Sequence, residues 1–124
     1  MNTSDLTGSA LDWAVAKIID GEAPVWDEST QNFLVGEESE HDFLNEFMPS
    51  TNWAQGGPII DLERISIRTY AKPGHNWVAF IDCGGSSISG AKARQVGPTA
   101  LTAAMRCFVA SKLGDTVELP KELT

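Results

Sequence analysis

A chain of 124 residues with a formal net charge of −8 has the length of one domain, and we expect residues 1–124 to fold as one. The acidic balance argues against direct nucleic-acid binding, because contacts between basic side chains and phosphates dominate that affinity. No apolar run approaches the about 18 residues of a membrane helix, and the first residues do not resemble a signal peptide. We therefore expect a cytoplasmic protein that makes no membrane contact.

The first predicted element is a helix over residues 7–19. Thr7 is a suitable cap for its first turn, and Gly21 is a suitable stop after its last. Apolar side chains recur at the spacing of one helix face, at Ala10, Leu11, Ala14, Val15 and Ile18.

An acidic segment follows at about residues 20–48, and we expect it to be variable. Between Ile18 and Glu63 the chain has eleven acidic residues and no Lys or Arg, whereas from Arg64 onward it has eight basic and four acidic residues. A short helix is expected over residues 37–48. The acidic residues form either a solvated surface that keeps the protein soluble, or a face that meets a basic partner or mimics nucleic acid.

Residues 49–58 are predicted to be a loop, because glycine and proline punctuate them. Residues 59–70 and 77–82 are predicted to be the two strands of a β-hairpin, since polar and apolar side chains alternate in the first of them. The turn between the strands has Pro73 and Gly74 at its tip.

Residues 84–98 are rich in glycine and serine, and we expect a loop there. A second amphipathic helix is predicted from Thr99 or Ala100 to Leu113, and residues 116–119 are predicted to add a short strand. The expected fold class is therefore α+β. A small antiparallel sheet, made of the hairpin and the C-terminal strand, is covered on one face by two amphipathic helices.

Signals for catalysis are weak. His41 and His75 belong to no zinc-binding spacing, and Cys83 and Cys107 form neither a CxxC pair nor a Cys/His cluster. We expect both cysteines to be reduced thiols. The serines that follow Gly84 match neither a nucleophile elbow nor a phosphate-binding loop. We therefore expect no enzyme activity, no metal and no cofactor.

Two loops carry candidate binding residues. Trp53 can stack on a flat ligand such as a base, and Asn52 and Gln55 can hydrogen-bond to a base edge. Gly56 and Gly57 permit close approach of the backbone. The alternative for this loop is that Trp53 is a plug of the core.

The second loop is the most cationic of the chain. Lys92 and Arg94 precede the free amides at the start of the helix at Thr99, and together these groups can bind a phosphate or carboxylate. Arg106 would reach such a ligand only from a helix face turned toward it. The alternative is an ordinary solvated loop. The predicted ligand-binding residues are thus Asn52, Trp53, Gln55, Gly56, Gly57, Lys92, Arg94, Thr99 and Arg106.

Three segments resemble the phage NinX family, which comprises small proteins of tailed phages with a domain of unknown function. They are Leu6–Lys17, Pro49–Ile60 and Gly97–Asp115, with the Val-Glu-Leu-Pro tail after them. The resemblance implies a phage protein made in the bacterial host cytoplasm during infection and not required for virion structure. It implies no reaction.

In its length and its layout of helices and hairpin, the chain is also similar to phage anti-defence sponge proteins, which sequester a cyclic-nucleotide immune signal without cleaving it. This layout implies a homo-oligomer with a site between subunits. The leading hypothesis is a phage accessory protein that sequesters a small anionic, nucleotide-derived ligand. The alternative is an acidic inhibitor or DNA mimic that contacts a host protein through residues 20–46. An enzyme that degrades the signal is a third hypothesis.

Overall fold

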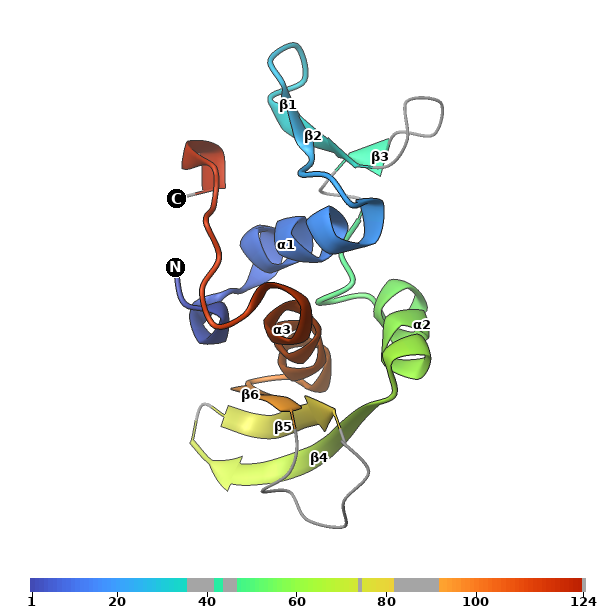
Figure 1. Cartoon of the computed structure of the whole chain (residues 1–124), viewed down its shortest axis with the longest axis vertical. Coiled ribbons are helices and arrows are strands. Elements are labelled where there is room, and N and C mark those ends of the chain that lie inside the picture. The colour runs from blue at the N-terminus through green and yellow to red at the C-terminus, as the bar shows by residue number, and fades with distance from the viewer. Residues whose placement is uncertain (36–41, 44–46, 74, 82–91, 124) are drawn as a thin grey trace.

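In the described part of the chain the fold has two antiparallel sheets and three α-helices, which confirms the predicted α+β class (Figure 1). The computed structural model describes residues 1–35, 42–43, 47–73, 75–81 and 92–123. The first sheet has the strand order β1 (Val25–Asp27), β2 (Asn32–Val35), β3 (Asp42–Phe43). The second sheet has the order β4 (Ile65–Lys72), β5 (His75–Ile81), β6 (Lys92–Gly97). The two sheets lie at opposite ends of the long axis, with the helices between them (Figure 1).

The two predicted helices are confirmed as α1 (Gly8–Asp20) and α3 (Ala100–Leu113). Their arrangement differs from the prediction, because they do not share one face of a sheet. α3 packs on the β4–β6 sheet, and α1 packs on α3. Every residue of α3 from Ala100 to Val109 is buried, so this helix is a central layer rather than an amphipathic cover.

The predicted hairpin is confirmed as β4–β5, but the predicted third strand is wrong. β6 occupies that place, within a stretch that composition marks as a loop, and it pairs antiparallel with β5. Residues 116–119 form no strand; Thr116 makes a single β-bridge with Asn2. Close packing on α3 explains β6, since an added Cβ at Gly97 would lie 2.8 Å from the Ala103 nitrogen.

α2 (Trp53–Glu63) replaces the predicted loop at 49–58 and the start of the predicted strand. The Oδ1 of Asn52 caps this helix by accepting from the N–H of Ala54 at 2.9 Å. Pro58 lies inside the helix although it lacks an N–H, so packing of α2 against α3 overrides the local preference.

The β1–β3 sheet was not predicted. Its Trp26 and Phe33 rings pack edge to face with centroids 5.0 Å apart. The helix predicted over 37–48 is wrong at Asp42–Phe43, which form β3. Residues 37–41 and 44–46 of that prediction lie outside the described residues.

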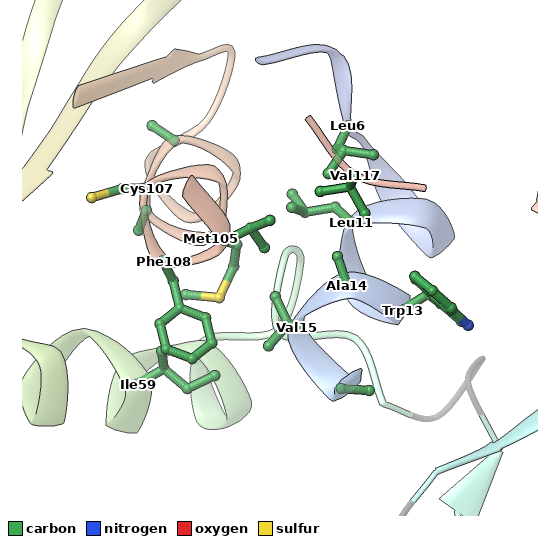
Figure 2. Close-up of a cluster of buried hydrophobic side chains, with 14 of the residues drawn as sticks. Leu6, Leu11, Trp13, Ala14, Val15, Ile59, Met105, Cys107, Phe108 and Val117 are labelled. Atoms are coloured by element: carbon green, nitrogen blue, oxygen red, sulfur yellow. The ribbon is translucent and has the colours of Figure 1, made fainter. Parts of the chain in front are cut away.

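The core joins segments that are distant in sequence (Figure 2). Leu6 and Leu11 lie beside Val117 of the C-terminal segment, and Met105 of α3 extends toward Phe108. α1 also holds the turn before α2, because the Asp12 carboxylate accepts from the buried N–H of Ser50 at 2.9 Å. Burial raises the pKa of Asp12, and this hydrogen bond opposes the rise.

Arg106 of α3 ties three segments together. It is only 5% exposed. Its Nε donates to the carbonyl oxygen of Leu6 and its Nη1 to that of Val96, each at 2.8 Å. Burial lowers the pKa of Arg106, and the charge of Asp5 opposes this shift. The guanidinium therefore joins α3 to the segment before α1 and to β6.

Arg106→Met should lower the free energy of unfolding by about 2–4 kcal/mol, because it leaves two buried carbonyl groups without a donor. Denaturant unfolding measures the change. Arg68→Gln, at an exposed residue of β4, should change it by less than about 0.5 kcal/mol. Similar values for the two variants would show that Arg106 does not hold these segments together.

The adjacent glycines Gly56 and Gly57 of α2 differ in the space around them. A Cβ at Gly56 would lie 2.5 Å from the carbonyl oxygen of Pro49 and 2.6 Å from Cδ2 of Leu101, whereas one at Gly57 meets nothing within 4 Å. Gly56→Ala should therefore destabilise the protein by about 3 kcal/mol. Gly57→Ala should change stability by less than about 1 kcal/mol, since the gain in helix propensity opposes the restriction before Pro58. Thermal unfolding of both variants tests this, and an equal effect would contradict the α2 packing.

Candidate functional site

The face of the β4–β6 sheet that points away from α3 carries a group of basic and aromatic side chains. Ile65 and Ile67 of β4 pack into the core. Since side chains alternate along a strand, Arg68 and Tyr70 project from the other face. The side chain of Lys72 also reaches the Tyr70 ring. Arg68 and Lys72 are exposed, and Tyr70 is partly buried.

Tyr70, Lys72 and Arg94 form one contact group, which we term the basic–aromatic cluster. The Cζ of Arg94 lies 5.3 Å from the centroid of the Tyr70 ring, and the Nζ of Lys72 lies 5.7 Å from it. Cation–π contacts at exposed sites contribute about 0.5–1 kcal/mol each. Such contacts order the side chains, but they are weak enough for a ligand that makes stronger interactions to replace them.

A β-bulge in β6 sets the direction of Arg94. Ala79 pairs with Gln95 and Ile81 pairs with Lys92, so two residues of β6 face one residue of β5. One of the two, Ala93, has the left-handed φ of 56° that non-glycine residues seldom adopt. Ala93 packs against the core, whereas Arg94 is exposed and reaches Tyr70. The strained backbone therefore separates a core residue from a cluster residue.

The cluster is electropositive at the Tyr70 hydroxyl. Hydrogen bonds from the side chains of Arg94 and, next, Lys72 lower the pKa of Tyr70, and the positive charges of both act in the same direction. A site that stabilises phenolate also favours other anions. The arrangement therefore provides two cationic donors and an aromatic ring in one exposed place.

The predicted site residues near Trp53 have mainly local contacts. Trp53 is the first residue of α2 and is 58% exposed, so it is not a plug of the core. Asn52 caps α2 through its side chain, and the Oε1 of Gln55 accepts from the N–H of Met48 at 2.6 Å. Gly56 packs against Pro49 and Leu101, whereas Gly57 has open space at its Cα.

The remaining predicted residues lie on β6 and α3. Lys92 is the first residue of β6, and Arg94 belongs to the cluster. Thr99 caps α3: its Oγ1 accepts from the N–H of Thr102 at 3.1 Å. The side chain of Arg106 is turned into the protein, toward the carbonyls of Leu6 and Val96.

The predicted site residues therefore lie in separate regions of the structure. The Trp53 group bonds within the turn that starts α2, and Arg94 contacts Tyr70 on the sheet. Their roles as ligand-binding residues stay predictions. Tyr70 and Lys72 are additions from the structure. The signal for them was the alternation along β4, which puts residues two apart on one face.

Cys107 is the one cysteine in the described part of the chain. Cys107 is a buried free thiol, and burial raises its pKa to about 12, so the thiol stays protonated at neutral pH. Cys83 lies outside the described residues. No group of three or more His, Cys, Asp or Glu side chains suited to a metal occurs among the described residues.

Arg94→Gln should raise the pKa of the Tyr70 phenol toward its usual range, because the largest cause of the lowering is removed. The chain has one tyrosine, so titration of the phenolate absorbance reports Tyr70 alone. Arg68→Gln removes the same charge from the same sheet and should move this pKa less. Identical titration curves for wild type and Arg94→Gln would exclude the contact between Arg94 and Tyr70 in solution.

Comparison with known proteins places the chain in a family. The family described as "Bacteriophage P22, NinX" matches residues 2–112. No curated protein matches the chain. In the described part of the chain, no helix has the length and apolarity needed to cross a bilayer. The match covers both sheets, α1, α2 and all but the last residue of α3, so the chain belongs to the bacteriophage NinX family.

Proposed function

We propose that this phage protein is an accessory protein that binds and sequesters a small anionic, nucleotide-derived ligand without cleaving it. In this proposal the basic–aromatic cluster holds the anionic group. The observation that carries it is the convergence of Arg94 and Lys72 on the Tyr70 ring, at an exposed site of a chain with a net charge of −8. Such a local reversal of charge favours an anion.

The chemistry of the cluster fits a nucleotide better than a simple ion. The Arg94 guanidinium can donate two parallel hydrogen bonds to a phosphate, and the Lys72 ammonium adds a compact positive charge. The Tyr70 ring offers a surface for stacking a base, which contributes about 1–3 kcal/mol in proteins that bind single-stranded nucleic acids. A ligand with both a ring and a phosphate uses all three side chains.

A homo-oligomer is part of the proposal. Arg68, Lys72 and Arg94 are exposed on a sheet face, so one subunit covers a bound nucleotide from one side. Small-molecule sites usually bury most of their ligand. A second subunit would supply the other side, and the exposed Trp53 is the residue that we propose stacks there.

The test is a thermal-shift and native mass-spectrometry screen against cyclic nucleotides and cyclic ADP-ribose isomers. A ligand that binds only the folded protein raises the melting temperature by mass action. Arg94→Gln should weaken binding of the active compound by about tenfold or more, because a charge-assisted hydrogen bond is lost. Arg68→Gln, with the same loss of charge on the same sheet, should have a smaller effect.

Recovery of the ligand after denaturation separates sequestration from catalysis. Intact ligand supports the proposal, whereas a cleaved product would show an enzyme that degrades the signal. An equal loss of affinity in Arg94→Gln and Arg68→Gln would indicate general electrostatic attraction rather than the cluster. Absence of any shift across the panel would contradict this ligand class and favour the acidic inhibitor.

A further inference from the structure

The last turns of the three helices converge on an apolar groove. It has a volume of about 500 Å³. Its walls are Ile18 and Ile19 at the end of α1, Ile59 and Leu62 of α2, and Phe108 of α3. Phe108 points toward Ile59 at the junction of α3 and α2 (Figure 2). We term this feature the three-helix groove.

Two apolar side chains of the three-helix groove are strongly exposed. Leu62 is 80% exposed and Ile19 is 51% exposed. They come from different helices and line the same hollow, so they form a continuous apolar surface rather than isolated residues. A groove between helices with apolar walls is a typical binding place for the apolar side chains of a partner segment.

The charges around the groove favour a basic partner. Glu63 lines the groove, Asp20 and Asp61 are adjacent in sequence to its walls from α1 and α2, and the stretch from Ile18 to Glu63 has no Lys or Arg. The C-terminal ends of helices carry a partial negative charge, and three such ends meet here. These features add to the net charge of −8 in attracting a cation.

The basic side chains near the groove either contact another side chain of the protein or do not line the groove. The Nζ of Lys112, at the rim, lies 3.3 Å from the carboxylate of Glu63. The Nζ of Lys17 lies 5.6 Å from the Trp13 ring. Arg64 follows α2 and does not line the groove. The pair between Lys112 and Glu63 is partly exposed and contributes little to stability, so Glu63 can change its partner at low cost.

We propose that the three-helix groove binds a segment of a partner protein whose apolar side chains are flanked by Lys or Arg. The apolar side chains enter between Ile19 and Leu62, and the basic side chains meet Glu63 and the helix ends. This surface is separate from the basic–aromatic cluster, so the inference does not depend on the proposed nucleotide-derived ligand.

Three synthetic peptides test the proposal on the full chain. The first is an amphipathic helix of Leu and Lys, the second replaces each Lys by Glu, and the third is the Leu/Lys peptide in scrambled order. Fluorescence anisotropy at physiological salt should show the first peptide binding at least about tenfold more tightly than the others. Equal affinity for the Leu/Glu peptide would overturn the charge argument, and equal affinity for the scrambled peptide would reduce the binding to general attraction.

Exposed apolar residues supply matched variants that leave the core intact. Leu62→Ser and Ile19→Ser should each weaken binding of the Leu/Lys peptide by about tenfold. Val25→Ser, at a residue of β1 that is 67% exposed and does not line the groove, should leave it unchanged. Comparable losses in all three variants would contradict the groove. Analytical sedimentation of the chain alone completes the test. If the chain self-associates and Leu62→Ser abolishes this, the groove binds a second copy of the chain, and the proposal is wrong.

Discussion

The arrangement of the layers depends on the buried guanidinium of Arg106. Its two hydrogen bonds end on the carbonyls of Leu6 and Val96, which are 90 residues apart in sequence. β6 must then lie close to α3, and Gly97 allows this because no Cβ separates it from the Ala103 backbone. α3 thereby becomes the central layer, with the β4–β6 sheet on one side and α1 and α2 on the other.

Local patterns in the sequence predict the elements whose periodicity is undisturbed. α1, α3 and the β4–β5 hairpin have regular spacing, and capping residues or turn residues mark their ends. Local patterns do not predict α2, since Gly56, Gly57 and Pro58 are typical helix breakers. They do not predict β6 either, because a Gly/Ser-rich composition is typical of a loop. Contacts with α3 stabilise both elements, and no local pattern encodes such contacts.

In the candidate site, too, local sequence patterns predict some features, whereas others depend on tertiary contacts. Arg94 can be selected from the sequence because it stands in the most basic loop of an acidic chain. The alternation along β4 puts Tyr70 on a face with Arg68, but its contact with Arg94 cannot be predicted, because β4 and β6 come together only on either side of β5. Polar residues before a helix are ambiguous for a different reason. Asn52 and Thr99 suit ligands and helix caps equally well, and in the structure their side chains cap α2 and α3.

The separation of the two sheets makes the molecule an electric dipole. β1–β3 come from the stretch without Lys or Arg, whereas Arg68, Lys72 and Arg94 lie on the β4–β6 sheet at the other end of the long axis (Figure 1). A dipole experiences a torque in the field of any charged surface, at distances up to about the 8 Å Debye length of physiological salt. The protein will therefore rotate before contact, with its β4–β6 sheet toward anions and its β1–β3 sheet toward basic surfaces.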